Sequence, residues 1–528
     1  MGIKWKKFPL KRHVRTWEEK DMEKEVKNQI LQLLATLQEA HDDIGLRIEN
    51  EEYEKVRGIL ADCQESAISA GNRIEQFEKN QGEIIRVLEE YCEQLFCINT
   101  ALVNQEQLNS AAVREKLNQY IIDARRRVKN NIKTLKAVFF PYKASMWASL
   151  DSIWRAAQKD VECEAKVVVI PYHTLDSNGK EDEFHYEASL FPPEVPIVHY
   201  NQYAIEQERP DIVFIHNPYD GGNSVTRVPK EYYSYRLKMY TKRLVYSPYC
   251  LLGYYSPEEG SFLCLTNGAQ MADKVLVQSE RVKQIYMDHK IDEKRLLALG
   301  SPKVDAIVEG MKMPKAYPKG WEQKLGGRKV FLLNTHLSYF VMGFDAKQQR
   351  PDNVDFAQWH HEDIFNHLLN KEGCGLIWRP HPLLKAMLKS RNLYSSLEFI
   401  EKWEQRIAES ENGVLDENGE YATSFHLSDA LITTYSTMIA EYMISGKPVC
   451  IFEYPLDEEN CKNSPVDYRH NYYKERRGEE NKLFEFIQMV LDERDPLYEE
   501  RIKDVHRAFD NLEGTVGENV YEWLKRDS

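Results

Sequence analysis

The stretch from Ser428 to Pro455 (SDALITTYSTMIAEYMISGKPVCIFEYP) constrains the fold more than any other part of the sequence. It opens with a short apolar run typical of a buried strand and passes through a small, hydroxylic turn into residues of helical spacing. Gly446 then ends the helix before a second apolar run. Strand, helix and strand in this order form a βαβ unit, which needs a parallel sheet. We therefore predict an α/β fold.

The turn at the start of that helix has the composition of an anion site. Ser436 and Thr437 offer hydroxyl donors beside the unpaired N–H groups of a first helical turn, and Glu441 follows one turn later. A phosphate on the hydroxyls and a sugar diol on the carboxylate fit this spacing. The alternative is that Ser436 and Thr437 only cap the helix and that Glu441 lies at the surface. Spacing alone leaves both interpretations open.

Composition excludes several classes of protein. The chain has 528 residues, which is enough for about three or four domains. Its net charge of −14 argues against a general nucleic-acid binder. The 9 cysteines form no CxxC pair, which indicates neither a zinc site nor a disulfide framework and fits reduced thiols in the cytoplasm. No apolar run reaches transmembrane length. We expect a soluble, cytoplasmic protein.

The N-terminal part is predicted to be a basic tail and an all-α bundle or coiled coil over residues 1–133. The tail, Met1–Arg15, has the composition of a peripheral contact with the inner face of the membrane, although a solvated tail is the simpler interpretation. Apolar residues then recur with a 4-3-4 rhythm that suits helix packing, oligomerisation or docking. Breaks between helices are expected at Glu49–Glu52, Ser69–Asn72 and Asn104–Ser110, which favours an antiparallel bundle.

After Leu135 the pattern changes to apolar runs separated by helical stretches, which is typical of doubly wound sheets. We predict a Rossmann-like lobe over residues 134–312, a second over 313–481, and an amphipathic helical tail over 482–528. Strands of the first lobe are expected within Leu135–Phe140, Ala165–Tyr172, Pro210–Asp220, Lys242–Tyr249, Ala272–Ser279 and Leu296–Lys303. Strands of the second are expected within Arg328–His336, Cys374–Pro382, Leu397–Glu401, Ala430–Ser436 and Pro448–Pro455.

Three motifs carry a family likeness: the stretch from Ser428, RPHP at Arg379–Pro382, and GSPKVDAI at Gly300–Ile307. In combination they resemble the CDP-glycerol glycerophosphotransferase family of teichoic-acid polymerases, over roughly Leu135 to Lys482. The resemblance implies the GT-B fold and transfer of glycerol phosphate, or a related polyol phosphate, from a CDP-activated donor. The implied acceptor is a cell-wall, teichoic-acid-type or surface polysaccharide polymer, and the implied donor binding needs no metal or other cofactor.

The chain departs from the family pattern at two places. The donor turn of the family reads D-Y-S-S, whereas here it reads Thr434-Tyr435-Ser436-Thr437, so the hydroxyls are kept and the aspartate is replaced. The W-H-G-T-P segment of the first lobe, which carries the family's candidate base, is not found. The corresponding region reads Tyr246-Ser247-Pro248-Tyr249-Cys250.

Candidate donor-binding residues are Arg379, His381, Ser436, Thr437 and Glu441. Arg379 and His381 directly follow a strand, where Arg379 suits bidentate pairing with a phosphate, and the resemblance places His381 at the donor phosphates. It also places Glu441 in donor binding. The alternative is that Arg379 binds a surface carboxylate and His381 packs under a loop.

Three residues compete as the general base. His216 ends PDIVFIH, His336 ends FLLNTH, and Asp220 is a carboxylate alternative. Histidine is the usual acceptor of a hydroxyl proton at neutral pH, although a lone histidine at a strand end is more often structural. We assign catalysis to His216, because it lies in the acceptor lobe, together with His381.

Acceptor binding is assigned to Lys143, Ser145, Asp220 and Asn223. Lys143 and Ser145 open the first helix of the acceptor lobe and suit an acceptor phosphate, whereas Asn223 lies in a glycine-rich stretch that can close over substrate.

Two other functions remain open, because one fold hosts many activities. One is a UDP-sugar-dependent GT-B glycosyltransferase or epimerase, and the other is a catalytically inactive GT-B scaffold. The expected partners are a nucleotide-activated donor, a polymer or lipid-linked acceptor and a second copy of the chain through the bundle, with no nucleic acid.

Overall fold

The computed structural model describes residues 17–77, 82–176, 178–256, 262–314, 316–336, 340, 352–418, 421–452, 458–476, 479 and 481–527. Contacts divide the chain into two compact units. The first holds the N-terminal helices with residues 157–166 and 201–212, and the second holds most of the α/β part. The basic stretch Met1–Arg15 lies outside the described residues, so its membrane contact stays a prediction.

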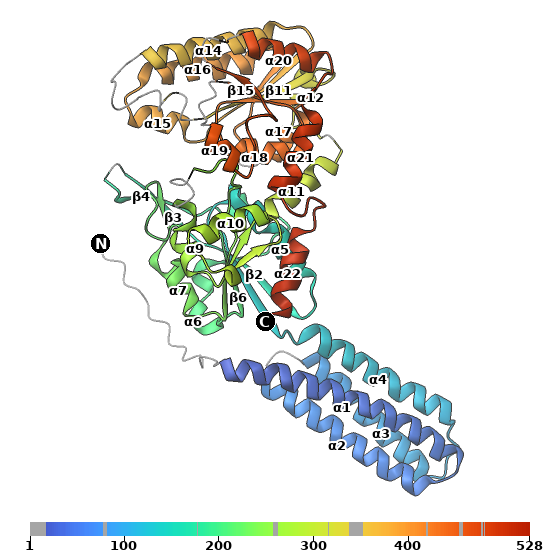
Figure 1. The fold of residues 1–528 in the computed structure, drawn as a ribbon. Helices are drawn as coiled ribbons and strands as arrows, with labels where there is room; N and C mark the ends of the chain where they lie inside the picture. Colours follow the sequence, from blue (N-terminus) through green and yellow to red (C-terminus); the bar gives the residue numbers. More distant parts are fainter. Residues whose placement is uncertain are drawn as a thin grey trace. The chain divides into compact units, whose positions relative to one another are not determined.

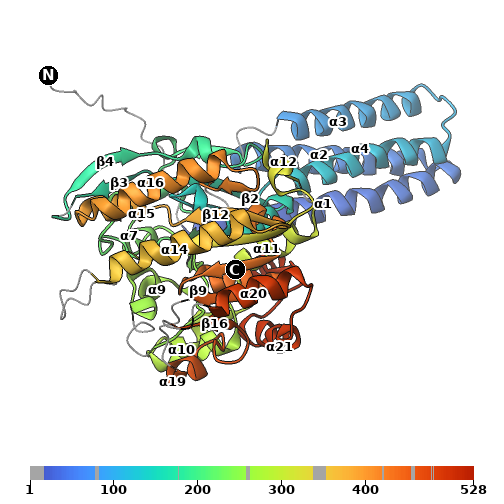
Figure 2. The same cartoon turned by 90° about the horizontal axis from the view of Figure 1, so that it is seen from above.

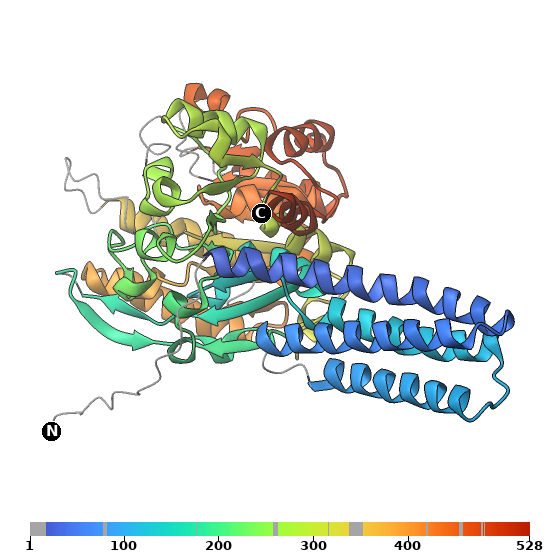
Figure 3. The same cartoon turned by 90° about the horizontal axis from the view of Figure 1, so that it is seen from below.

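The N-terminal helices form a bundle. They are α1 (Trp17–Glu49), α2 (Tyr53–Phe77), α3 (Gly82–Val103) and α4 (Ser110–Asn131). Figure 2 and Figure 3 show the four helices side by side. Their apolar residues form one buried core cluster. The breaks predicted at Glu49–Glu52 and Asn104–Ser110 are confirmed, and connections this short join antiparallel neighbours.

The break predicted at Ser69–Asn72 is wrong, because α2 runs through it. Ala67, Ala70 and Ile74 are buried at helical spacing, so packing holds the small residues of this stretch in the helix. Gly71 adds no strain, since a Cβ there would only touch Leu88 of α3 at 3.9 Å.

The first lobe is built on a sheet of seven strands in the order β10-β9-β8-β6-β1-β2-β5. The pairs β10–β9, β9–β8 and β2–β5 are parallel. The strands are β1 (Leu135–Phe140), β2 (Cys163–Val169), β5 (Ile197–His199), β6 (Ile212–Ile215), β8 (Arg243–Tyr246), β9 (Lys274–Val277) and β10 (Leu296–Ala298). All six predicted runs fall on strands. A small sheet of β4 (Glu181–His185), β3 (Tyr172–Leu175) and β7 (Thr226–Arg227) was not predicted.

The second lobe has a fully parallel sheet in the order β13-β12-β11-β14-β15-β16. Its strands are β11 (Lys329–Thr335), β12 (Cys374–Pro380), β13 (Gly413–Leu415), β14 (Ala430–Thr433), β15 (Val449–Phe452) and β16 (Tyr473–Glu475). The pair of Rossmann-type lobes preceded by a helical bundle, predicted from the sequence, is confirmed.

Alternation along β11 shows why this sheet is covered on both faces. Phe331 and Leu333 join one apolar core, and Val330 and Leu332 join the other. Helices α14 (Asp352–Asn370), α16 (Tyr394–Glu409) and α20 (Asn481–Leu491) cover the first core. Helices α11 (Pro302–Lys312), α17 (Ala422–Leu427) and α18 (Met438–Tyr442) cover the second, as Figure 1 shows.

One predicted strand of this lobe is wrong. Leu397–Glu401 lies within α16, where Leu397, Ile400, Trp403 and Ile407 are buried at intervals of three to four residues. A window of five residues is too short to separate this helical period from an apolar strand.

The C-terminal tail is helical, as predicted, with α20 followed by α21 (Tyr498–Ala508) and α22 (Val516–Arg526). Helix α22 returns to the first lobe, where the N–H groups of Val516 and Gly517 donate to the buried Asp305 carboxylate at 3.0 and 2.8 Å. The predicted domain boundaries remain predictions. No helix within the described residues is long and apolar enough to cross a membrane.

Candidate active site

The register of two central strands brings two candidate histidines together. Thr335 at the end of β11 pairs with Pro380 at the end of β12, so His336 and His381 follow at the same sheet edge. Their ring centroids are 5.3 Å apart and the rings meet edge to face. This is the carboxyl edge of a parallel sheet, where ligands of such folds bind.

The hydrogen bonding of His381 defines its chemistry. Its Nδ1 accepts the N–H of Leu383 at 3.1 Å. Burial, followed by the proximity of His336, lowers the pKa of His381 to about 4, so the ring is neutral at pH 7. A neutral imidazole that accepts at Nδ1 carries its proton on Nε2. His381 therefore presents an N–H donor, which suits a phosphate oxygen better than it suits proton abstraction.

Arg379 is already engaged in this structure. It is buried, its Nη1 forms an ion pair with Asp416, and its Nη2 donates to the carbonyl of Asn418 at 2.7 Å. Asp416 also accepts from the Ser424 hydroxyl. The carboxylate considered as the alternative partner is thus present, although it is buried rather than at the surface. Phosphate binding by Arg379 stays a prediction.

A pocket of about 160 Å³ opens beside these residues. Its lining includes Arg379, His381, Lys385, Glu404 and Asp416. Pockets that enclose a whole small ligand measure roughly 300–1,000 Å³, so this one can form only one subsite of a nucleotide site.

The Ser436 hydroxyl forms a hydrogen bond within its own turn, which is a more local role than the predicted anion site. Ser436 is buried and its hydroxyl accepts the N–H of Met438 at 3.1 Å, whereas Thr437 is exposed. Helix α18 is only 5 residues long and passes into the 3₁₀ turn Met443–Ser445. The geometry of Ser436 matches the capping alternative, and its part in donor binding, like that of Thr437, remains a prediction.

Glu441 is buried in an ion pair instead of lying at the surface. Its carboxylate pairs with Lys303 of α11, and both side chains are less than a tenth exposed. Burial alone would lower the pKa of Lys303, but the Glu441 carboxylate and Tyr421 raise it above its ordinary value. The ammonium also lies 5.3 Å from the centroid of the Tyr421 ring. Lys303 thus ties α11 to α18.

Lys303 lies within GSPKVDAI, but no role for it was predicted from the sequence. Its position after Pro302 at the start of a helix was a usable signal, whereas the partner Glu441 lies 138 residues away and was not predictable.

His216 is fully buried at the end of β6. Its Nε2 accepts the N–H of Tyr142 at 3.1 Å, and Nδ1 lies 3.2 Å from the Ser149 hydroxyl and 3.3 Å from the Met146 carbonyl. Burial lowers the pKa of His216 to about 3. Both ring nitrogens of His216 contact the turn after β1, which matches the structural role considered for a lone histidine. The role of His216 as general base stays a prediction, and this conformation does not support it.

Asp220 and Asn223 both stabilise their own loop. Asp220 is buried and accepts the backbone N–H and the hydroxyl of Ser234, each at 2.7 Å. Asn223 accepts the N–H of Val225 and donates to Thr226. Their predicted acceptor roles remain untested. Lys143 is half-buried and Ser145 exposed in the turn after β1.

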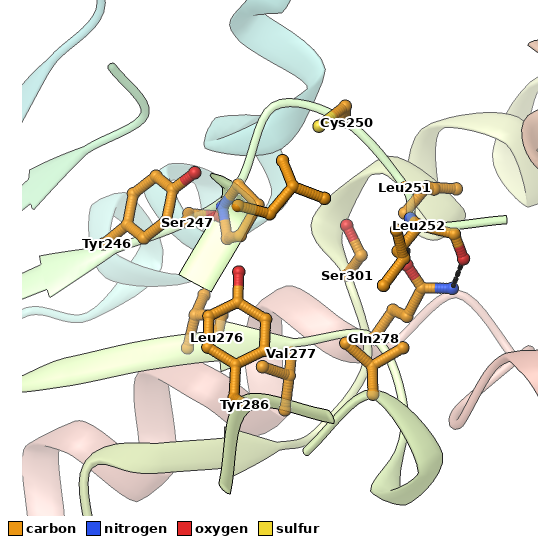
Figure 4. A pocket seen from close by; sticks show the side chains of 13 residues that line it. Tyr246, Ser247, Cys250, Leu251, Leu252, Leu276, Val277, Gln278, Tyr286 and Ser301 are labelled. Carbon is orange, nitrogen blue, oxygen red and sulfur yellow. Dashed lines mark hydrogen bonds between the residues drawn. The ribbon is translucent and has the colours of Figure 1, made fainter. Parts of the chain in front are cut away.

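The region that replaces the W-H-G-T-P segment borders a small cavity of about 30 Å³ (Figure 4). Tyr246 and Ser247 lie on one side of it, and Gln278 donates to the carbonyl of Leu252 on the other. Such a volume admits a water molecule but no nucleotide. Burial raises the pKa of the Cys250 thiol to about 11, so this cysteine is no thiolate nucleophile at pH 7.

No cluster of three or more His, Cys, Asp or Glu residues suited to a metal ion occurs in the part of the chain that the structure describes. Donor binding without a metal remains a prediction.

Buried neutral histidines predict a loss of stability at acid pH. Burial lowers the pKa of His216 and of His361 to about 3, from an ordinary value of 6.5. Below pH 6.5 the unfolded chain binds protons that the folded chain does not, so the free energy of unfolding falls as pH falls toward 3, by about 1.4 kcal/mol per histidine per pH unit.

Urea unfolding at pH 7, 6, 5 and 4 measures this loss. In His361→Gln the amide can keep a hydrogen bond with the Thr335 hydroxyl, which lies 2.8 Å from His361 Nε2 in the native protein. The pH slope of this variant is expected to be shallower by about one proton. An identical slope in both proteins would contradict a neutral His361.

Comparisons with known proteins agree with these motifs. Residues 264–525 match the family model described as CDP-glycerol:poly(glycerophosphate) glycerophosphotransferase. The match supports a glycerophosphotransferase-like family for this part of the chain. The glycerophosphotransferase match includes Lys303, Arg379, His381, Ser436 and Glu441, and therefore the whole carboxyl edge of the second sheet.

Among curated proteins, the chain is similar to a teichoic acid poly(ribitol-phosphate) polymerase of Bacillus spizizenii, with 23% identity over 252 residues. This match covers 48% of this chain and 37% of the relative, so the chain spans only about a third of that protein.

Solved structures with similar folds include a variant of the wall teichoic acid polymerase TagF, with TM-score 0.47 and 13% identity over 83% of this chain and 98% of that chain. A UDP-N-acetylglucosamine 2-epimerase has TM-score 0.45 and 12% identity over 74% of this chain and 95% of that chain.

Proposed function

We propose that the protein is a transferase that moves glycerol phosphate, or a related polyol phosphate, from a CDP-activated donor to a hydroxyl of a cell-wall polymer. The observation that carries the proposal is the edge of the second sheet, where His336 and His381 meet beside a pocket lined by Arg379. The glycerophosphotransferase family match over the same residues supports it.

In the proposed reaction, the acceptor oxygen attacks the phosphorus that carries the polyol. A new O–P bond forms, the bond to the cytidine monophosphate breaks, and CMP leaves with the electron pair. The acceptor proton passes to a base. The protein has to neutralise the diphosphate, take this proton and hold both substrates in line.

Donor binding is the proposed role of His381 and Arg379. The Nε2–H of His381 is available for a phosphate oxygen, because Nδ1 is occupied by the N–H of Leu383. The ion pair with Asp416 holds Arg379 in the lining of the pocket, so the positive charge of its guanidinium stays at one position there. Glu441 takes part in donor binding only if Lys303 is displaced, because the ion pair now occupies its carboxylate.

Proton transfer is reassigned in this proposal from His216 to His336. His216 is fully buried, with both ring nitrogens held by the turn after β1. His336 is partly exposed at the end of β11, and burial lowers its pKa below the ordinary value, which favours the neutral form that accepts a proton. We also keep a cytoplasmic location with a lipid-linked or polymer acceptor as part of the proposal.

Thermal shift assays across CDP-glycerol, CDP-ribitol, CDP, UDP, UDP-sugars and GDP test the donor. A ligand at about a hundred times its dissociation constant stabilises the native state by about 2.7 kcal/mol. We expect the cytidine diphosphates to stabilise the protein selectively. Selective stabilisation by uridine nucleotides would replace the proposal with a UDP-sugar enzyme, and no response to any nucleotide would favour an inactive scaffold.

A further inference from the structure

A larger pocket opens at the other edge of the sheet that carries His336 and His381. Its volume is about 450 Å³, which lies within the range of roughly 300–1,000 Å³ that encloses a whole small ligand. The pocket is lined where three neighbouring strands begin. Arg328 directly precedes β11, Lys371 lies shortly before β12, and Asn412 directly precedes β13. We name it the amino-edge pocket.

The amino-edge pocket is separate from the edge at which the two histidines meet. Arg328 precedes β11, whereas His336 follows it. Strand β11 has 7 residues and a strand rises about 3.3 Å per residue, so its two ends lie roughly 20 Å apart. A small ligand in the amino-edge pocket therefore does not reach His336 or His381.

Two cations lie together at the start of β11 and β12. Arg328 and Lys371 are both half-buried, and the strand register pairs Lys329 with Cys374 between them. Burial raises the pKa of the Cys374 thiol to about 11, and the charges of Lys371 and Arg328 both oppose that rise. The two positive charges thus act on the same buried thiol, which places them close to each other.

A third cation, Arg406 of α16, completes the basic part of the lining. Its guanidinium carbon lies 4.4 Å from the centroid of the buried Trp403 ring, and a cation–π contact of this kind leaves the N–H donors available. In the part of the chain that the structure describes, the side chains of Arg328, Lys371 and Arg406 form no ion pair and no hydrogen bond. Three cations therefore border one pocket without an anionic partner.

The carbonyl groups at the ends of α14 and α16 would disfavour an anion, but other side chains bind them. Asn412 Nδ2 donates to the carbonyl of Leu368 in the last turn of α14 at 3.2 Å. Lys324 Nζ donates to the carbonyl of Ala408 in the last turn of α16 at 2.6 Å. The three cations of the pocket are thus not needed to neutralise these helix ends.

Glutamates line the same pocket without pairing with its cations. They are Glu372, Glu409 and Glu411, and all three are exposed. A simple anion would gain from the cations and be repelled by these carboxylates. A ligand that carries both an anionic group and hydroxyl groups can use the whole lining, because a carboxylate accepts hydrogen bonds from hydroxyls.

From this arrangement we propose that the amino-edge pocket binds a small phosphate monoester that also carries hydroxyl groups. A phosphate monoester has a charge of about −1.5 to −2 at pH 7 and three acceptor oxygens, which suits the adjacent cations Arg328 and Lys371 with Arg406 as a further donor. The hydroxyl groups donate to the glutamates. No residue assigned above to donor binding, acceptor binding or catalysis lines this pocket, so its ligand is additional to the proposed donor and acceptor.

The test measures binding of glycerol 3-phosphate to the full-length protein by titration calorimetry. We expect Lys371→Gln and Arg328→Gln each to weaken binding about ten- to a hundredfold, as for the loss of one hydrogen bond between charged groups. Lys371→Arg keeps the charge and is expected to retain most of the affinity. Lys319→Gln, at an exposed lysine outside the lining, is the matched control and is expected to bind as wild type does.

Folding is checked by urea unfolding of the same variants. Neither Arg328 nor Lys371 has a side-chain partner to lose, so both glutamine variants are expected to unfold at the wild-type midpoint. Equal affinity of wild type and both variants for glycerol 3-phosphate, or no binding by wild type, would overturn the proposal.

Three further ligands define the chemical class. Glycerol, which lacks the phosphate, is expected not to bind. Glycerophosphoglycerol, a diester with a single charge, is expected to bind about tenfold more weakly than glycerol 3-phosphate, and equal binding would overturn the monoester class. Inorganic phosphate is expected to bind more weakly as well, and an affinity equal to that of glycerol 3-phosphate would show an adventitious ion only.

Two cross-checks separate this pocket from the proposed transferase site. His381→Ala is expected to bind glycerol 3-phosphate as wild type does, and CDP-glycerol is expected to stabilise Lys371→Gln as much as wild type. A loss in either measurement would place both ligands in one site and overturn a separate pocket. The proposed function fails differently, namely when no CDP-polyol binds or is turned over, and binding of glycerol 3-phosphate that depends on Lys371 would keep the amino-edge pocket in that case.

Discussion

Lys303→Met is expected to destabilise the protein by about 3–5 kcal/mol, because it leaves the Glu441 carboxylate buried without its partner. Both side chains are less than a tenth exposed, so water cannot replace the lost ammonium. The pair also joins α11 to α18. Urea unfolding at pH 7 measures the change.

The double variant Lys303→Met, Glu441→Leu separates an unpaired charge from a packing defect. Replacing both members of a buried ion pair by apolar residues is often close to neutral, so the double variant is expected to recover most of the lost stability. Lys503→Met, which breaks an exposed pair with Glu500, is the control and should leave the unfolding midpoint unchanged. A double variant as unstable as the single one would show that Lys303 acts mainly through its packing and its contact with Tyr421.

His381→Ala is expected to lower kcat about 100- to 1,000-fold, the usual result of removing one donor to the reacting group. In this account the lost donor is the Nε2–H, because Nδ1 accepts from Leu383. His336→Ala is expected to lower kcat by a similar or larger factor as the proposed base, roughly 100- to 10,000-fold. Steady-state kinetics with a CDP-polyol and a polymer acceptor measure both.

The two histidines are distinguished by donor binding. His381→Ala is expected to weaken the stabilisation by CDP, whereas His336→Ala is expected to preserve it. His216→Gln keeps an acceptor for the Tyr142 N–H and serves as the buried control. Loss of transfer in His216→Gln, with donor binding and stability unchanged, would contradict the reassignment and return the base to His216.

The strands could be predicted from the sequence because apolar runs between turns carry that signal locally. Strands β11, β12 and β14 are parallel neighbours, so the side chains that follow them lie at one edge of the sheet. His336 and His381 lie close together because each directly follows one of these paired strands. The wrong strand, Leu397–Glu401, arose where a buried helix face resembles a strand over five residues. The short strands β13 and β16 at the two edges of this sheet were not predicted.

The partners of charged and polar residues could not be predicted, because they depend on long-range packing. Arg379 meets Asp416 across 37 residues, and His216 meets Tyr142 across 74. A sequence pattern gives the position of His216 after a strand but not its burial, and burial is what lowers its pKa and removes it from solvent. The site residues were thus predictable as a group at strand ends, whereas their individual roles were not.

The most direct test of a CDP-polyol transferase is release of CMP from CDP-glycerol and CDP-ribitol by the full-length protein, measured chromatographically with and without an oligo(glycerol phosphate) acceptor. We expect CMP to appear with at least one donor, its release to depend on the acceptor, and His381→Ala nearly to abolish that release. Turnover of a UDP-sugar with no CMP from either cytidine donor would rule out a CDP-polyol transferase.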